Sequence, residues 1–325
     1  MFINDQTAMP KPTASQALVK IHSFGLNRMD LLQREGLYPL PPQAPSTMGV
    51  EFSGTIEQLS AGAERGFKKG DAVFGLAYGG AYAEYIAVST HMLVHKPEEL
   101  SWEECAGVPE TWITALQAMY LIGEFAPGKS ILWHAGASSV SIAGQQLSRG
   151  NGASKVFATA RSDEKCDFCV KELGADAAFN TTKGDWAEQV LQATDGKGVD
   201  VIVDFIGPES FAANLRAAAR DALLVAREGE HGQGDRNRHV DADLAGLNLL
   251  LEARGGRART CEDRGAVAVF VRVDEGDGVV ERRGRETDED GAEDFFFVAG
   301  HFGRDVGDDR GANLGEIWLV GNEGL

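Results

Sequence analysis

Small and hydroxyl-bearing residues follow an apolar stretch at residues 134–147, where the chain reads HAGASSVSIAGQQL. The run KSILW before them is typical of a strand, and the apolar residues after them recur at helical spacing. A dinucleotide phosphate needs such a strand-to-helix corner, with close backbone approach and free N–H groups at the helix start. Gly136 indicates the position of the corner, and Ala135 beside it is small. The hydroxyls of Ser138 and Ser139 could cap the helix or donate to phosphate. The alternative is a plain strand–helix corner that binds nothing.

Basic and hydroxyl side chains follow the next strand-like run, KVFATA. Arg161, Ser162 and Lys165 stand where a site for NAD would have an Asp or Glu that accepts from the ribose hydroxyls. Their chemistry suits a ribose 2′-phosphate, although Asp163 and Glu164 partly offset the positive charge. The pattern therefore favours NADP(H). The alternative is that these polar residues only begin a helix.

The cysteines and histidines show no pattern of metal ligands. Cys166 and Cys169 have the spacing of a redox pair or of half a zinc site, but a zinc site needs four ligands and the chain has no second pair. They lie in a helix-like stretch, DEKCDFCVKELG, where they would share one face as ordinary helix cysteines. His91 and His95 have no ligand grouping either, so we expect no metal.

Strand and helix signals alternate from residue 129 to about residue 226. Alternation with short connections predicts a parallel sheet covered on both faces, the doubly wound architecture of nucleotide-binding domains. Residues 1–104 instead contain strand-like runs such as GVEFSGTIEQL, separated by glycine-containing turns. The expected fold class is α/β, with a β-rich domain at residues 1–104 and a nucleotide-binding domain at residues 105–227.

Composition limits the kinds of partner. The net charge of −18 argues against nucleic acid, whose phosphates attract clustered Lys and Arg. No run approaches the roughly 20 consecutive apolar residues of a membrane span, and the opening MFINDQ lacks the character of a signal peptide. We expect a cytoplasmic protein with no membrane or nucleic-acid partner.

Motifs across residues 15–226 resemble the zinc-independent quinone oxidoreductases, of zeta-crystallin type, of the medium-chain dehydrogenase/reductase superfamily. In order they are GLNRMDLLQREGLYPLPP, GVEFSGTIE, FKKGDAVFGLAYGGAYAEY, PETWITALQAM, ILWHAGASSV and GVDVIVDFIG. The resemblance implies a GroES-like β-rich catalytic domain joined to a Rossmann domain. It also implies hydride transfer from NADPH to quinones or related α,β-unsaturated carbonyls, in a homodimer or homotetramer.

The resemblance gives roles to individual positions. Asn27 and Tyr38 fall where the family lines the cleft around the nicotinamide and the quinone, and Thr114 falls where it contacts the nicotinamide. The other implied contacts are the pyrophosphate turn at Ala135, Ser138, Ser139 and Val140, the 2′-phosphate contacts at Ser162 and Lys165, and the crevice after the fourth strand at Phe205, Ile206 and Gly207.

Some positions depart from the family pattern, and others exclude the zinc-dependent relatives. Ser139 and Ser141 stand where the family's turn has glycines, and Thr181 replaces its tyrosine near the adenine. The zinc-dependent relatives have a cysteine at the position of Asn27 and a histidine at that of Val50. Their four-cysteine zinc lobe is also missing from this chain. The resemblance therefore implies a site without zinc.

The implied chemistry needs no strong nucleophile, because the cofactor would carry the hydride and the protein would orient it. Asn27 and the Tyr38 hydroxyl would hydrogen-bond the substrate oxygen as negative charge develops, with the proton coming from Tyr38 or water. Tyr38 could instead only pack beside its proline-rich loop. Two other functions stay open: a non-catalytic NADPH-binding or defective family member, and an enoyl-thioester reductase of the same superfamily.

The last hundred residues have a different composition. From residue 227 onward there are 13 Arg, 23 Asp or Glu, 18 Gly and no Lys, without apolar periodicity, so no packed domain is predicted there. The family's later motifs are not legible, and its opening strand is expected to be shortened because residues 1–9 replace it. We expect residues 228–325 to be an atypical, irregular acidic tail, either disordered or translated in a frame shifted from about residues 221–227 onward. Such a tail would leave the strand at ALLVA as an unpaired sheet edge.

Overall fold

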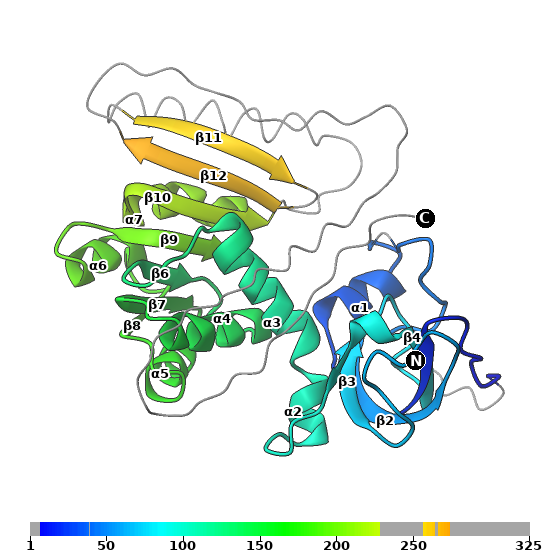
Figure 1. The fold of residues 1–325 in the computed structure, drawn as a ribbon. Helices are drawn as coiled ribbons and strands as arrows, with labels where there is room; N and C mark the ends of the chain where they lie inside the picture. The colour runs from blue at the N-terminus through cyan, green and yellow to red at the C-terminus, as the bar shows by residue number, and fades with distance from the viewer. Residues whose placement is uncertain (1–6, 39, 228–255, 264–265, 274–325) are drawn as a thin grey trace. The chain divides into compact units, whose positions relative to one another are not determined.

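The computed structural model describes residues 7–38, 40–227, 256–263 and 266–273 (Figure 1). These residues divide into two compact units, one up to Pro109 and one from Glu110 onward. Within the described ranges, no helix is long and apolar enough to cross a membrane.

The first unit is built on an antiparallel sheet of five strands in the order β4-β1-β2-β3-β5. Its central strands bury Val19, Phe52 and Ile56 in one apolar cluster, as alternating strand residues do. The strands are β1 (Gln16–Phe24), β2 (Glu51–Leu59), β3 (Ala72–Leu76), β4 (Tyr85–Ser89) and β5 (Leu93–His95), and the helices are α1 (Arg28–Arg34), η1 (Thr90–Met92) and α2 (Trp102–Ala106).

The second unit contains the predicted parallel sheet, in the order β10-β9-β6-β7-β8. The prediction of a doubly wound α/β fold is confirmed. Its parallel strands are β6 (Ser130–Trp133), β7 (Lys155–Ala160), β8 (Ala177–Asn180), β9 (Val199–Asp204) and β10 (Ala218–Arg227). Its helices are α3 (Pro109–Leu116), the π-helical η2 (Gln117–Ile122), α4 (Ser139–Gly150), α5 (Asp163–Lys171), α6 (Trp186–Ala193), η3 (Pro208–Ser210) and α7 (Phe211–Ala217).

Alternate residues of each parallel strand pack on opposite faces of this sheet. Ile131 and Val201 join a cluster with residues of α3 and α4, whereas Leu132 and Ile202 join one with residues of α6 and α7. Helices therefore cover both faces of the sheet (Figure 1). Because β6, β7 and β9 are parallel, their carboxyl ends and the loops that follow lie at the same end of the sheet.

Two further strands, β11 (Gly256–Asp263) and β12 (Ala266–Val273), extend this sheet. β12 pairs antiparallel with β10, with Leu223 opposite Phe270, and β11 pairs with β12. The prediction of an unpaired edge at β10 is therefore wrong, and so is that of an irregular tail for these two segments. β12 reads AVAVFVRV, with valine at every second position, a local strand signal that the acidic average composition of the tail conceals. The rest of the predicted tail lies outside the described residues.

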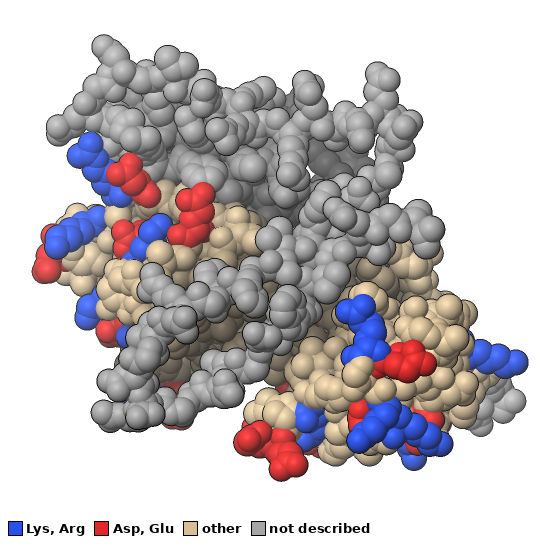
Figure 2. All heavy atoms as spheres, viewed as in Figure 1, with Lys and Arg blue, Asp and Glu red and all other residues tan. Residues whose placement is uncertain are grey.

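Figure 2 shows one face of the molecule, on which basic and acidic side chains of the described residues are intermixed. Among the described residues, several charged side chains form pairs, such as Arg149 with Asp176 at 2.7 Å and Lys171 with Asp167 at 2.7 Å. Pairs this exposed contribute little to stability. The packing of apolar residues against the two sheets therefore carries the fold.

A buried polar network lies at the carboxyl ends of β6, β7 and β9. His134, fully buried, is 2.7 Å from Thr159 Oγ1 through Nδ1 and 2.6 Å from Asn214 Oδ1 through Nε2. Asn214 Nδ2 and the Ser210 hydroxyl each donate to Asp204 Oδ2 at 2.7 Å. The network thus joins the loop after β6 to the loop after β9.

The partners in this network fix the direction of its hydrogen bonds. Burial lowers the pKa of His134, and the charge of Asp204 and the bond to Asn214 oppose this only partly, so His134 is neutral. Asn214 donates its amide hydrogen to Asp204, so its oxygen accepts from Nε2–H of His134. Nδ1 of His134 then accepts from the Thr159 hydroxyl, and every bond has one donor and one acceptor.

A first prediction concerns the packing of α4 on β6. A Cβ at Gly144 would lie 2.3 Å from the Trp133 ring, so Gly144→Ala should destabilise the protein by about 1–3 kcal/mol through overpacking. Gly150→Ala, in the same helix with nothing within 4 Å, is the matched control and should be neutral or stabilising by up to about 1 kcal/mol. Urea unfolding of both variants measures this. Equal effects of the two substitutions would contradict the packing.

A second prediction concerns acid sensitivity. The pKa of His134 is lower in the folded state than in the unfolded state, so the unfolded state binds the proton first and stability falls as the pH drops below about 6.5. His134→Gln should be less stable than the wild type at pH 7 but should lose less unfolding free energy between pH 7 and pH 5. Urea unfolding across this range gives both slopes. Parallel slopes would show that His134 is not held neutral.

Candidate functional site

The turn after β6 is shaped by crowding against β7 and α5. Gly136 donates its backbone N–H to Thr159 O at 2.7 Å, and a Cβ there would lie 2.7 Å from Cys169 Sγ and 2.8 Å from Ala158 Cβ. The residue with positive φ is Ala135, at 49°, so the left-handed corner lies one residue before the predicted Gly136. Gly136 is needed for space and Ala135 makes the bend.

Serines at the start of α4 meet the geometric needs of a phosphate turn. Ser138 is the N-cap residue, and its side chain makes no capping hydrogen bond to the helix. Ser139 and Val140 follow as the first helical residues, whose backbone N–H groups have no partner within the helix. Ser138 and Ser139 are exposed, so this end of α4 can receive an anion.

The serines that replace the family's glycines cause no backbone strain. Neither Ser139 nor Ser141 has a positive φ. Ser141 is buried, and its hydroxyl donates to His134 O at 2.6 Å and lies 3.2 Å from the Ser138 hydroxyl. Ser141 therefore ties α4 to the turn, while Ser139 stays at the surface.

The loop after β9 is held by Asp204. Its Oδ1 accepts from the backbone N–H groups of Ile206 at 2.7 Å and Gly207 at 3.2 Å. Phe205 stacks on Trp133 at 6.4 Å, Ile206 is exposed, and Gly207 has a φ of 110°. The predicted crevice residues therefore form one loop, which Asp204 shapes from below.

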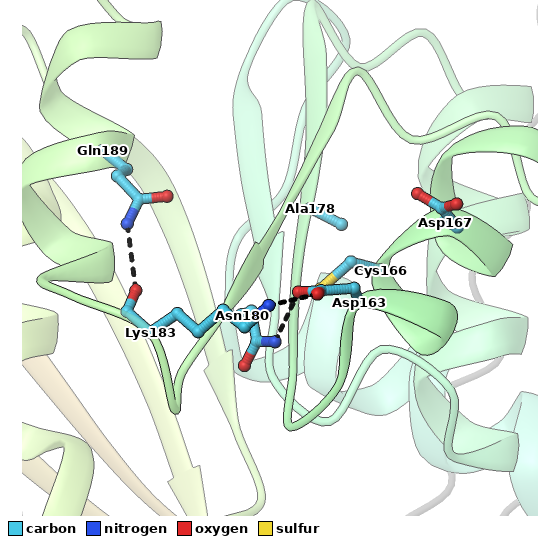
Figure 3. A pocket seen from close by; sticks show the side chains of 7 residues that line it. All are labelled: Asp163, Cys166, Asp167, Ala178, Asn180, Lys183 and Gln189. Atoms are coloured by element: carbon cyan, nitrogen blue, oxygen red, sulfur yellow. Dashed lines mark hydrogen bonds and ion pairs between the residues drawn. The ribbon is translucent and has the colours of Figure 1, made fainter.

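The end of β7 presents the predicted basic side chains. Arg161 and Lys165 are exposed, and Ser162 caps α5 by accepting from the backbone N–H of Lys165 at 3.4 Å. Asp163 is engaged elsewhere: its Oδ1 accepts from Asn180 Nδ2 at 2.7 Å and its Oδ2 pairs with Lys183 (Figure 3). These bonds lower the pKa of Asp163, and Lys183 offsets the charge that would oppose a bound phosphate.

Next to these residues, α5 and β8 line a pocket of about 340 Å³ that also includes Lys183 and Gln189 (Figure 3). Cys166 borders it, and Cys169, three residues later in α5, is buried. Burial raises the pKa of both thiols, to about 11 for Cys169, so both stay protonated at neutral pH. They behave as ordinary helix cysteines.

In the first unit, Asn27 stands directly before α1 and belongs to a polar cluster. Its Nδ2 donates to Glu51 Oε1 at 2.8 Å, and its backbone N–H donates to Asp30 Oδ2 at 2.7 Å. The Tyr82 hydroxyl also donates to Asp30 Oδ2 at 2.7 Å. Burial and the bond to Asp30 raise the pKa of Tyr82, so the phenol stays protonated. Asp30 and Glu51 are both buried.

Three members of this cluster, Asp30, Glu51 and Tyr82, were not predicted from the sequence. The spacing of Asn27 and Asp30 is that of a helix-capping pair, which is a readable signal. A Cβ at Gly25 would lie 2.1 Å from Glu51 Oε1, so Gly25 leaves room for that carboxylate. No local pattern indicates Tyr82, whose partner is 52 residues away.

Tyr38 and Thr114 lie apart from these clusters along the chain. Tyr38 follows the end of α1 and is half-buried. Thr114 lies within α3 in the second unit, and its hydroxyl donates to Glu110 O at 2.7 Å, one turn earlier in the helix. Asn27 and Tyr38 thus belong to one unit, and Thr114 belongs to the other with all the predicted phosphate contacts.

The positions that hold zinc in the zinc-dependent relatives do not fit a metal here. Val50 is a buried apolar side chain, and the Asn27 amide donates to Glu51 instead of offering a thiolate or imidazole. Across the described ranges, no three His, Cys, Asp or Glu side chains gather as ligands.

Comparison with known proteins gives matches for both units. Residues 13–98 match the alcohol dehydrogenase GroES-like domain, and residues 139–227 match a family described as zinc-binding dehydrogenase. Quinone oxidoreductase from Pongo abelii is 31% identical over 224 residues, which are 69% of this chain and 67% of the relative.

Solved structures agree with this. Escherichia coli quinone oxidoreductase, solved in complex with NADPH, is 26% identical with a TM-score of 0.61, covering 67% of this chain and 66% of that one. The CurK enoyl reductase is 27% identical with a TM-score of 0.59, covering 66% of each chain. Both units and their order in the sequence are those of one superfamily, and the chain belongs to the quinone oxidoreductases of the medium-chain dehydrogenase/reductase superfamily.

Proposed function

We propose that the chain is an NADPH-dependent quinone oxidoreductase that reduces quinones or related α,β-unsaturated carbonyls. The observation that carries this proposal is the turn after β6, where Ala135 bends the chain, Gly136 leaves no room for a side chain, and α4 begins with exposed serines. This arrangement fits the pyrophosphate of a dinucleotide. NADPH bound there supplies a hydride from its nicotinamide.

In this proposal, different residues of the second unit bind different parts of the cofactor. Arg161, Ser162 and Lys165 hold the 2′-phosphate, favoured by the pairing of Asp163 with Lys183. The turn and the first residues of α4 would hold the pyrophosphate, and Thr114 and the loop after β9 would contact the nicotinamide. The proposed contacts there are Ala135, Gly136, Ser138, Ser139 and Val140 for the pyrophosphate, and Phe205, Ile206 and Gly207 for the nicotinamide.

The first unit receives the substrate oxygen. Glu51 takes one hydrogen of the Asn27 amide and so orients it, which leaves the second hydrogen for the substrate oxygen as negative charge develops. The Tyr38 hydroxyl is the second donor, and the proton comes from Tyr38 or water. Asp30 and Glu51 lie buried beside Asn27 and disfavour an anionic substrate, which suits an uncharged carbonyl compound.

An enoyl-thioester reductase is a second candidate, favoured by the likeness to the CurK enoyl reductase. It would use the same cofactor, because both substrates accept a hydride at a carbon conjugated to a carbonyl. The two substrates differ in the groups attached to the reacting atoms: an enoyl thioester is joined to a long carrier group, whereas a quinone is a compact ring. Turnover with each class of substrate separates the two.

We further propose that the reaction is independent of metal and that the protein is a cytoplasmic assembly of identical chains. The reaction needs no zinc, because Val50 and Asn27 occupy the ligand positions of the zinc-dependent relatives. Residues 1–104 form the catalytic domain and residues 105–227 the NADP-binding domain of a cytoplasmic homodimer or homotetramer.

Titration of the purified protein with NADPH, followed by fluorescence, tests the function directly. We expect saturable binding, oxidation of NADPH on addition of 1,4-benzoquinone, and the same rate after exhaustive treatment with 1,10-phenanthroline. Saturable binding without turnover of any quinone or enoyl thioester would make the chain a non-catalytic NADPH-binding protein. Loss of activity together with stoichiometric zinc would overturn the metal-independent reaction.

The choice of cofactor is tested by Arg161→Ala/Lys165→Ala. Removing two charge-assisted contacts should weaken NADPH binding about tenfold or more and leave NADH binding nearly unchanged. Lys171→Ala, on the same helix but paired with Asp167, is the matched control and should alter neither affinity. Equal affinities of the intact protein for NADPH and NADH would contradict the assignment.

A further inference from the structure

The buried polar network connects two loops that bind different ends of the proposed cofactor. His134 begins the phosphate turn, and its carbonyl oxygen accepts from Ser141 of α4. Asp204 ends β9 and accepts from the backbone of the loop that follows. Asn214 of α7 bridges His134 and Asp204 through both ends of its amide, at 2.6 Å and 2.7 Å.

Asp204 is the charged member of this network and satisfies four donors. Oδ1 accepts from the N–H groups of Ile206 and Gly207, and Oδ2 accepts from Ser210 and Asn214. A buried carboxylate is tolerated only with such partners, and here two of them are the backbone of a surface loop. The Asp204 carboxylate therefore holds two backbone N–H groups of that loop, and the Ser210 hydroxyl also contacts the loop, at 2.9 Å from Gly207 O.

We propose that Asp204 is a positioning residue for the nicotinamide end of the cofactor, held in register with the phosphate turn by Asn214 and His134. The carboxylate fixes the backbone of the loop at Ile206 and Gly207, so the ring meets a preformed surface and does not have to order the loop when it binds. This inference rests on the proposed NADPH site. It adds that the affinity for the nicotinamide half depends on a residue that does not touch the cofactor.

Asp200, half-buried in the same strand, offers a comparison for Asp204. It lies near the amino end of β9, and its Oδ2 accepts from the backbone N–H of Ser130 at 2.7 Å and from the Ser130 hydroxyl at 2.6 Å. Asp200 thus joins β9 to β6 at the amino ends of these strands, whereas Asp204 lies at the carboxyl end of β9 and accepts from the loop that follows, from Ser210 and from Asn214. If both carboxylates had only a structural role, Asp204→Ala and Asp200→Ala would change ligand affinity to a similar extent.

The experiment compares the binding of NADPH with that of 2′-phospho-ADP-ribose, which lacks the nicotinamide, for the full-length wild type and its variants. Asp204→Ala should weaken NADPH binding about tenfold or more, since it removes bonds to a charged group, and should change binding of the fragment less than about threefold. Asp200→Ala should leave both affinities unchanged. Ser210→Ala removes one donor to Asp204 together with the contact of the same hydroxyl to Gly207 O, and should shift the same ratio in the same direction by about two- to threefold.

The ratio of the two affinities decides the outcome. If Asp204→Ala does not fold, as judged by circular dichroism, the ratio measured for Ser210→Ala carries the test. The inference is overturned if both ligands lose affinity equally, if neither does, or if Asp200→Ala gives the same ratio. A wild type that binds the fragment and NADPH leaves the proposed site standing whatever the variants show, whereas a wild type that binds neither overturns that site and this inference with it.

Discussion

The close contact between the turn after β6 and its neighbours determines much of the second unit. Gly136 lies where a Cβ would overlap Cys169 Sγ and Ala158 Cβ, and its N–H bonds to the end of β7. Because the backbone is fixed there, the left-handed bend falls on Ala135 and α4 starts at a set distance from the strand ends. The same contact places His134 deep enough to lose contact with water and to require partners from β7 and α7.

The sequence predicted the elements whose signals are local. SILW and VDVIVD are short apolar runs between turn residues, and their alternation with helical stretches is enough to predict a parallel sheet. The strand β12 was missed because its signal was averaged with the charged residues around it. The sequence indicated that Gly136 is special, but the reason is the close approach of Cys169 in α5, which depends on packing and cannot be read from the turn itself.

Site residues divide in the same way. Arg161, Ser162 and Lys165 could be named from their place after β7, whereas Asn27 and Thr114 were named only through resemblance. The partners that orient them were not named at all, since Glu51 is 24 residues from Asn27 and Asn214 is 80 residues from His134. Such pairs form when distant strands close into a sheet, and single residues give no sign of which pair will meet. Both units bury carboxylates among polar partners: the first unit has Asp30 bonded to the Tyr82 phenol, and the second has Asp204 in the network with the neutral imidazole of His134.

The antiparallel pairing of β12 on β10 has a consequence for synthesis. Arg227, the last residue of β10, pairs with Ala266, so the ribosome must add about 40 residues after β10 before its partner begins to emerge. At roughly 5–20 residues per second, this delay lasts some seconds, far longer than a hairpin needs to form. During that interval the growing chain presents the unpaired edge of an apolar strand to its surroundings. Its solubility in the cell therefore depends on whether its own later segment, a chaperone or another nascent chain binds that edge first.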